Sequence, residues 1–156
     1  MRLIDFFDRG VSLDGGRAAF IDENGTISYQ EAQEYTHQLA NALAAEGIKS
    51  GDVVAIYSPN DARAFLCILG IIRAGAIYVN LNGLSPIEDN LYVLKDRDAC
   101  LLFIHSQFEQ HLEQILDQAP KVASVVTIDR TFGGSSCLSD WIAQHPGTAP
   151  DIPREL

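Results

Sequence analysis

The sequence has no run of basic residues and no long apolar segment. Eleven Lys and Arg residues stand against 21 Asp and Glu residues, which gives a net charge of −10. Nucleic-acid binding depends on clustered cations that neutralise phosphates, so this composition argues against it, and against binding to an anionic membrane surface. The longest apolar run, residues 64–72, is less than half of the roughly 20 residues that a membrane-spanning helix needs.

The sequence also lacks paired cysteines and the residue pattern of a signal peptide. Cys67, Cys100 and Cys137 form no C-x-x-C pair and are odd in number, which argues against a disulfide scaffold and a structural zinc site. Asp5 and Asp8 fall where the apolar part of a signal peptide would have to lie. We therefore expect a cytoplasmic chain without a membrane span.

What the sequence does have is the composition of a folded domain. Of its 156 residues, 47% are hydrophobic and 21% are charged, and a chain of this length buries roughly 68–70% of its unfolded surface. Short β-type runs alternate with amphipathic helical segments. The expected strands are residues 53–57, 77–79, 100–104 and 122–128, and Asn24-Gly25 predicts a hairpin that joins residues 18–22 to residues 26–27.

The segments between the strands carry helix-start signals. Asn60 is expected to cap a helix over residues 61–73, which is apolar on nearly every side and should be buried on more than one face. Three pairs match the capping-box pattern: Ser28 with Glu31, Ser85 with Glu88, and Ser106 with Glu109. Apolar strands that alternate with helices predict an α/β fold, a doubly wound, mostly parallel sheet flanked by helices, with an N-terminal β-hairpin.

The composition and the strand–helix pattern of the sequence change near residue 130. Residues 1–130 are expected to form the α/β unit. Residues 131–156 contain Gly133-Gly134, one short helical candidate over 138–143 and several prolines. We interpret this second stretch as an exit segment rather than a second domain.

In a doubly wound sheet the ligand usually lies at the carboxyl ends of the strands. The loops expected there are residues 58–60, 80–85 and 105–106. None of them carries a G-x-G-x-x-G or a Walker A pattern, so the sequence shows no phosphate-binding signature. Asn80 and Asn82 tolerate left-handed backbone and are interpreted as loop formers before ligands.

The histidines and serines do not form a catalytic set in the sequence. His37, His105, His111 and His145 lack the spacing of a metal pair and are interpreted as solvated or supporting residues, with His105 at a strand end the one most worth following. Ser106 follows His105, but its capping-box match makes helix capping its expected role. No catalytic residue, metal ligand or cofactor-binding residue is therefore assigned.

Several motifs nevertheless resemble, in order and spacing, those of the adenylate-forming superfamily of acyl-CoA synthetases, luciferases and adenylation domains. The resemblance covers about residues 17–142. Its parts are residues 27–32 (ISYQEA), similar to L-[TS]-Y-x-E-L; residues 47–55 (GIKSGDVVA), similar to G-[VI]-x-x-G-D-x-V-A; residues 58–60 (SPN), similar to L-P-N; residues 72–82 (IRAGAIYVNLN), similar to L-K-A-G-A-x-Y-V-P-L-x-P; and residues 138–142 (LSDWI), similar to S-L-x-x-W-L. Asn80 and Gly83 stand where that family usually has proline.

The resemblance implies the N-terminal subdomain of a carboxylate-activating ligase. In that family the phosphate loop with its lysine, the ribose-binding Asp and the C-terminal catalytic lysine lie downstream of the matched stretch. ATP, magnesium and coenzyme A are implied for the full-length family, which forms an acyl-adenylate and transfers the acyl group to the thiol of coenzyme A. Asn82 fits the V-x-L-N form of acyl-CoA ligases and favours them over a peptide-synthetase adenylation domain. The chain is expected to be inactive alone.

Two other interpretations stay open at this point. The chain could be an interaction module that keeps the fold without the chemistry, or a small nucleotide-binding protein with an unrecognised site. The expected partner is the remainder of the ligase domain or a second copy of the chain. A piece of a larger domain should expose an apolar patch of more than a few hundred Å² where the rest would pack.

Overall fold

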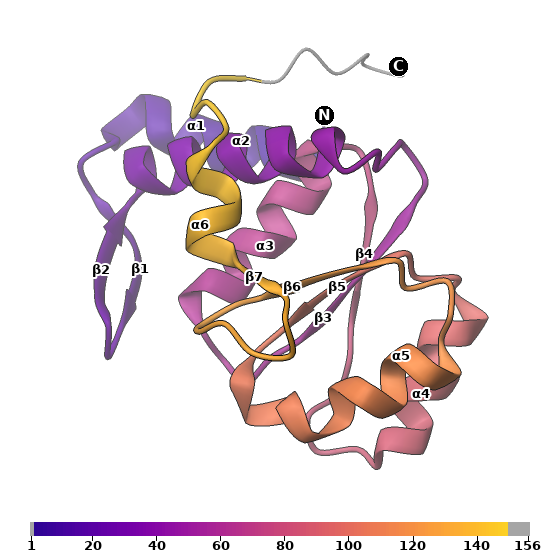
Figure 1. Ribbon diagram of the computed structural model, residues 1–156. Coiled ribbons are helices and arrows are strands. Elements are labelled where there is room, and N and C mark those ends of the chain that lie inside the picture. The colour runs from indigo at the N-terminus through magenta and orange to yellow at the C-terminus, as the bar shows by residue number, and fades with distance from the viewer. Residues whose placement is uncertain (1, 150–156) are drawn as a thin grey trace.

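Five parallel strands form the central sheet of the molecule (Figure 1). This computed structural model describes residues 2–149, and residues 150–156, the last part of the predicted exit segment, lie outside the described residues. Each strand is parallel to its neighbours, which confirms the predicted α/β class. The spatial order is β4-β3-β5-β6-β7, with bounds of Ile77–Asn80, Val53–Tyr57, Leu101–Ile104, Ser124–Thr127 and Ser136–Cys137.

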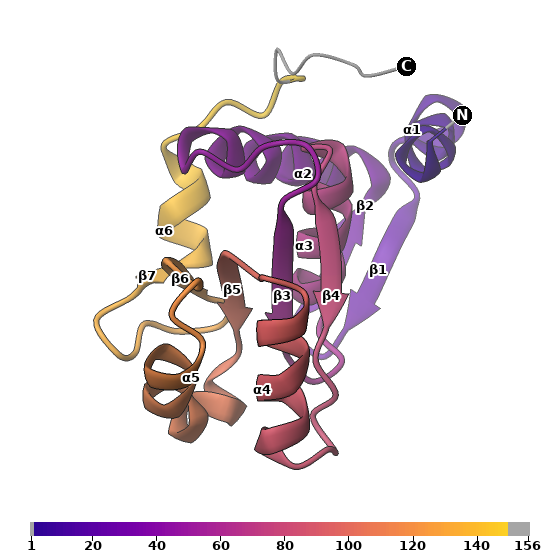
Figure 2. The ribbon, with the colours of Figure 1, turned by 90° about the vertical axis from the view of Figure 1, so that its right-hand side faces the viewer.

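Helices cover both faces of this sheet (Figure 2). The helices are α1 (Leu3–Asp14), α2 (Tyr29–Ala45), α3 (Ala62–Arg73), α4 (Ile87–Asp96), the 3-10 helix η1 (Ser106–His111), α5 (Leu112–Gln118) and α6 (Leu138–Ala143). Alternate side chains of β3 belong to separate cores: Val54 and Ile56 pack beneath α2, α3 and α6, whereas Ala55 and Tyr57 pack against α4 and α5.

The predicted hairpin and the first capping box are both confirmed. Strands β1 (Ala18–Asp22) and β2 (Gly25–Ser28) pair antiparallel, and Gly25 adopts a φ of 131°, which favours glycine. The hydroxyl of Ser28 accepts a hydrogen bond from the N–H of Glu31, whose carboxylate accepts one from the N–H of Ser28. These reciprocal bonds satisfy main-chain donors that the first turn of α2 would leave free.

Two other helix starts differ from the prediction. Asp61, not Asn60, is the N-cap of α3 and accepts a hydrogen bond from the N–H of Arg63. The Ser85 capping box does not form, because α4 begins after Pro86 without a side-chain cap. The loop before α4 is held differently: the Asn90 amide accepts from the N–H of Asn82 and donates to its carbonyl.

Two elements were not predicted at all. Helix α1 precedes the hairpin and buries Ile4, and the short strand β7 adds a fifth strand beside β6. Helix α6 was predicted and is present, with Leu138 and Ile142 buried against the sheet. Residues 136–143 therefore contribute to the same core as the strands before them.

A partly buried ion pair joins α1 to α3. The guanidinium of Arg73, whose side chain is only 7% exposed, donates to both carboxylate oxygens of Asp8 at 2.9 and 2.6 Å. Its Nε also donates to the hydroxyl of Thr36 on α2. The carboxylate of Asp8 further accepts from Gln33. Helix α1 is thus anchored by charge as well as by apolar contacts.

Residues 142–148, here named the C-terminal strap, cross the outer side of α2. Gln38 donates to the carbonyls of Ile142 and His145, and Asn41 donates to those of Pro146 and Thr148. A ring nitrogen of His37 lies 3.3 Å from the carbonyl of Gly147. Three side chains of one helix therefore fix the path of the strap.

Strand β4 is an edge of the sheet and is the most exposed of the longer strands. Ile77 is 52% exposed and Tyr78 is 41% exposed, and Leu84, in the loop that follows, is 97% exposed. Large apolar side chains therefore gather at this edge, where a larger domain would have a surface to cover. Within residues 2–149, no helix is long and apolar enough to cross a bilayer.

Candidate functional site

The strand order places one crevice at a defined point of the sheet. The first strand of the central sheet is β3. The chain passes from it to β4 on one side and then to β5 on the other side, so the connections diverge between β3 and β5. In open α/β sheets, ligands bind outside the carboxyl ends of the strands at this topological switch point. A cavity of about 440 Å³ lies beside this point, at the carboxyl ends of β3 and β4, lined by residues that include Ser58, Asn60, Phe65, Asn80, Gln107 and Phe108.

The first turn of α3 forms one wall of this crevice, and other groups of the protein already accept hydrogen bonds from its N–H groups. The N–H of Ala62 donates to Asp22 of the hairpin, and that of Arg63 donates to Asp61. The N–H groups of Ala64 and Phe65 donate to the carbonyl of Asp61. The three N–H groups after the N-cap, those of Ala62, Arg63 and Ala64, are therefore taken although a helix start normally leaves them free.

The loop after β5 is satisfied in the same way. The N–H of Ser106 donates to Asp129, which follows β6, and the hydroxyl of Ser106 donates to the same carboxylate. The N–H of Gln107 donates to Nδ1 of His105, and the N–H of Phe108 donates to the His105 carbonyl. His105, not Ser106, is thus the N-cap residue, and the predicted capping role of Ser106 is wrong because Asp129 attracts its hydroxyl.

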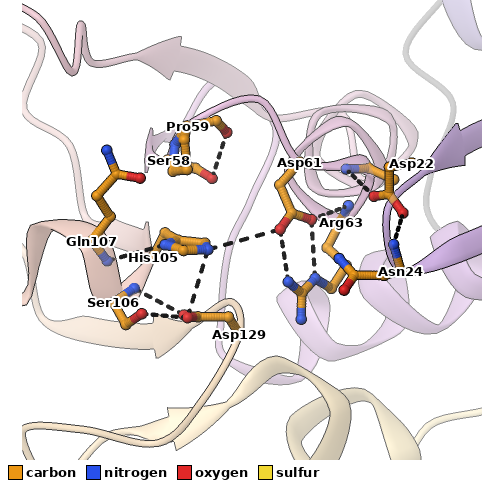
Figure 3. A network of polar contacts seen from close by, with 11 residues as sticks. Asp22, Asn24, Ser58, Pro59, Asp61, Arg63, His105, Ser106, Gln107 and Asp129 are labelled. Atoms are coloured by element: carbon orange, nitrogen blue, oxygen red, sulfur yellow. Dashed lines mark hydrogen bonds and ion pairs between the residues drawn. The ribbon is translucent and has the colours of Figure 1, made fainter.

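The imidazole of His105 lies between two carboxylates, as Figure 3 shows. Because Nδ1 accepts a hydrogen bond, the proton of a neutral ring resides on Nε2. That nitrogen is 3.6 Å from Asp129 and 3.8 Å from Asp61. These distances exceed those of hydrogen bonds, so the contacts are electrostatic. The three residues lie at the end of β5, at the end of β6 and at the start of α3, so these three elements are close together here.

Arg63 completes the network through a bidentate pair with Asp61. Its Nε and Nη2 donate to the two carboxylate oxygens at 3.0 and 2.7 Å. These bonds lower the pKa of Asp61 below its ordinary value, against the opposing effect of burial. Burial likewise opposes ionisation of Asp129, but the two hydrogen bonds from Ser106 outweigh it and lower the pKa of that carboxyl too.

The arrangement restricts the chemistry available at this edge. The hydroxyl of Ser106 donates to a carboxylate and not to an imidazole nitrogen, so it is not activated as a nucleophile. The occupied N–H groups and the paired Arg63 leave little to hold a polyphosphate. Among residues 2–149 no group of three His, Cys, Asp or Glu side chains is arranged to hold a metal ion.

The structure brings only part of the candidate residues together. His105, Asn60 and Asn80 lie at or beside the crevice. His37 contacts the C-terminal strap instead. The ring of His111 stacks on the ring of Tyr57, with the two ring centroids 6.2 Å apart. The network residues that the sequence did not reveal are Asp61, Arg63 and Asp129. Their one available signal was position, since each follows a predicted strand.

Comparison with known proteins decides the family. A family model described as "AMP-binding enzyme" matches residues 7–152. The chain belongs to the AMP-binding enzyme family. This agrees with the motif resemblance that runs through residues 17–142.

Individual members of the AMP-binding family show how much of the fold this chain spans. A long-chain-fatty-acid–CoA ligase of Escherichia coli O6:H1 is 31% identical over 117 residues, 74% of this chain and 21% of that protein. The crystal structure of the anthranilate CoA ligase AuaEII in complex with anthranoyl-AMP is 26% identical, with a TM-score of 0.89, and the match covers 99% of this chain and 30% of that chain. Tyrocidine synthase 3 of Brevibacillus parabrevis is 32% identical over 102 residues, 65% of this chain and 2% of that protein.

These matches show that the chain is much shorter than the members of the AMP-binding family that it matches. The chain spans about a quarter of the length of the fatty-acid–CoA ligases that it matches. Nearly all of its own length superposes on less than a third of the anthranilate CoA ligase chain. It is therefore a fragment of an AMP-binding domain, as the motif analysis predicted.

Proposed function

We propose that this chain is the N-terminal structural part of an ATP-dependent acyl-CoA ligase and does not catalyse the reaction alone. In the complete protein, a carboxylate would attack the α-phosphorus of ATP to give an acyl-adenylate and pyrophosphate. The thiol of coenzyme A would then attack the acyl carbon and release AMP. Magnesium would neutralise the polyphosphate. The supporting observation is the match of 99% of this chain to only 30% of an anthranilate CoA ligase.

The geometry of the chain supports this division of labour. The main-chain donors at the starts of α3 and η1 are occupied by Asp22, Asp61, His105 and Asp129. The residues present here therefore do not fit a polyphosphate, and ATP would be held by groups that lie outside this chain. The exposed β4 edge, with Ile77 and Tyr78, is the surface on which we expect the remainder of the domain to pack.

The parent protein is also proposed to work in the cytoplasm. Cys67, Cys100 and Cys137 are all unpaired thiols, as expected where the surroundings keep thiols reduced. Burial raises the pKa of the Cys67 thiol far above its ordinary value, so it stays protonated and unreactive.

The test is the coding sequence that follows the codon of Leu156, together with the activity of its product. We expect the frame to continue into a Thr/Ser/Gly-rich loop with a lysine, and the longer protein to form acyl-CoA from a fatty acid, ATP and coenzyme A. A stop codon directly after Leu156 would overturn the proposal and favour a non-catalytic interaction module.

A peptide-synthetase adenylation domain is the second candidate, favoured by the 32% identity to tyrocidine synthase 3. The same longer protein distinguishes the two. An acyl-CoA ligase releases a soluble thioester of coenzyme A, whereas an adenylation domain loads an amino acid onto a carrier-protein thiol.

A further inference from the structure

The sequence contains the pairs Asn24-Gly25 and Asn82-Gly83, which lie in very different surroundings. In an Asn-Gly pair the main-chain nitrogen of the glycine can attack the side-chain carbonyl carbon of the asparagine, because glycine has no Cβ to obstruct the approach and its backbone turns easily. The reaction requires the asparagine side chain and the peptide bond after it to reorient until these two atoms meet. The contacts that hold each pair therefore decide whether it can react.

Asn24-Gly25 lies at the tip of the β1–β2 hairpin, where residues 23–26 are all exposed. Asn24 donates its main-chain N–H to Asp22 at 2.9 Å, and within residues 2–149 its side-chain amide makes no hydrogen bond to protein. Among the described residues other than its chain neighbours, none comes within 4 Å of the place that a Cβ of Gly25 would take. Strands β1 and β2 form a two-stranded sheet of their own, and the ends of such ribbons open readily. The Asn24 side chain and the peptide bond after it are therefore free to turn.

Asn82-Gly83 is held through both its side chain and its main chain. The side-chain oxygen of Asn82 accepts a hydrogen bond from the N–H of Leu84 at 2.9 Å. The main-chain N–H and carbonyl of Asn82 bond to the amide of Asn90, which is only 2% exposed. Gly83 lies so close to Phe108 that a Cβ would be 2.6 Å from the ring. Reorienting this pair breaks hydrogen bonds and displaces an aromatic ring, so the folded structure protects it.

From this contrast we propose that Asn24 is a site of spontaneous modification, which loses its side-chain amide as ammonia while Asn82 stays intact. The main-chain nitrogen of Gly25 gives up its proton and forms a bond to Cγ of Asn24. The Cγ–Nδ2 bond breaks, and ammonia leaves with that proton, which closes a succinimide ring. Water then opens the ring at either of its carbonyl carbons and leaves aspartate or isoaspartate. This site lies outside the ligase proposal and does not depend on it.

The products act beyond the hairpin through Asp22. The carboxylate of Asp22 accepts from the N–H of Asn24 and, at 3.3 Å, from the N–H of Ala62 in the first turn of α3 (Figure 3). Either product adds a negative charge beside Asp22 and Glu23, where like charges repel. Isoaspartate also lengthens the main chain of the turn. We expect the bond from Ala62 to weaken, so that the chemical state of Asn24 is transmitted to the start of α3.

The rates at the two pairs of the same chain test the proposal. The purified chain is incubated at mildly alkaline pH, where the amide nitrogen of Gly25 loses its proton more readily. Mass spectrometry then follows the conversion of amide to acid in the tryptic peptides 18–49 and 74–95. We expect Asn24 to convert at least about tenfold faster than Asn82, since each hydrogen bond that must first break lowers the reactive population.

The unfolded chain and one variant are the controls for these rates. In concentrated urea the two pairs should react within about twofold of each other, because the contacts that distinguish them are lost. Asn24→Gln should stay unmodified, because its longer side chain closes the ring poorly. Equal rates in the folded chain, faster conversion of Asn82, or a difference that persists in urea would each overturn the proposal.

The aspartate product can be made directly to test the link to α3. Asn24→Asp reproduces it, and Gln110→Glu, at an exposed position of η1, makes the same change of charge elsewhere. We expect hydrogen exchange at the N–H of Ala62 to speed up by about twofold or more in Asn24→Asp and to stay unchanged in Gln110→Glu. Equal exchange at Ala62 in the two variants would overturn the transmission to α3.

Discussion

Removal of the carboxylate from Asp8 should destabilise the fold through the arginine it leaves behind. In Asp8→Ala the guanidinium of Arg73, 7% exposed, loses both of its bonds to the carboxylate and keeps only Thr36. Breaking a fully buried ion pair typically costs about 3–5 kcal/mol. Because Asp8 itself is 32% exposed and water can approach from its side, we expect the lower figure of about 2–3 kcal/mol.

Urea unfolding followed by circular dichroism measures this loss. For a domain of this size, a loss of about 2–3 kcal/mol corresponds to a fall in melting temperature of roughly 5–10 °C. Lys121→Met is the control, because Lys121 and Asp98 form an ion pair in which both side chains are more than 60% exposed, and such pairs contribute about 0–1 kcal/mol. Hydrogen exchange should also rise selectively in α1, since the carboxylate anchors that helix.

The double variant Asp8→Ala with Arg73→Met separates the pair from its surroundings. If the cost of Asp8→Ala arises from an unpaired buried charge, removing that charge should recover about half of it or more. A double variant as unstable as the sum of the two single variants would refute this reasoning. An Asp8→Ala variant as stable as the Lys121→Met control would do the same.

Three further outcomes are expected. Ser28→Ala removes one partner of the capping box and should lower the unfolding free energy by about 1 kcal/mol in urea titration, with Ser12→Ala on α1 as the comparison. Gly83→Ala places a Cβ 2.6 Å from the ring of Phe108 and should cost about 1–3 kcal/mol, whereas the uncrowded Gly16→Ala should not. Because hydrogen bonds lower the pKa of Asp129 in the folded state, its contribution is complete above about pH 5 and is lost as the pH falls below about 4. Asp129→Asn should therefore lower stability at pH 7 and flatten its acid dependence; an unchanged slope would contradict the assignment.

The sequence predicted the fold where local chemistry and burial agree. Ser28 and Glu31 carry a complete capping signal, and both of its reciprocal bonds form, so the helix starts where expected. At Ser106 the same local pattern failed because Asp129, 23 residues later in the chain, binds the hydroxyl more strongly. A capping box is a local rule, and a tertiary carboxylate overrides it.

The candidate site shows the same limit. The sequence predicted a site at the loops after the strands, and two of these loops, residues 58–60 and 80–85, contribute to the crevice; His105 was singled out by its place at a strand end. Its partners were not found, because Asp61 and Asp129 come from different connections and meet only when β3, β5 and β6 are side by side. Helix α1 was missed for a related reason: Ile4 is buried and Asp8 is paired only once α1 packs against α2 and α3.

The C-terminal strap has a consequence for the order of folding. Its hydrogen bonds to Gln38 and Asn41 join residues that are separated by 104 to 107 positions in the sequence. Helices α2 and α3, in contrast, pack together across a much shorter stretch of chain. Contacts between distant residues pay a larger loop-closure entropy and form more slowly. On a ribosome, α2 is complete long before its outer side receives residues 142–148. The amides of Gln38 and Asn41 are therefore open to water until residues 142–148 have been made, and the strap closes over α2 after α2 and α3 have packed together.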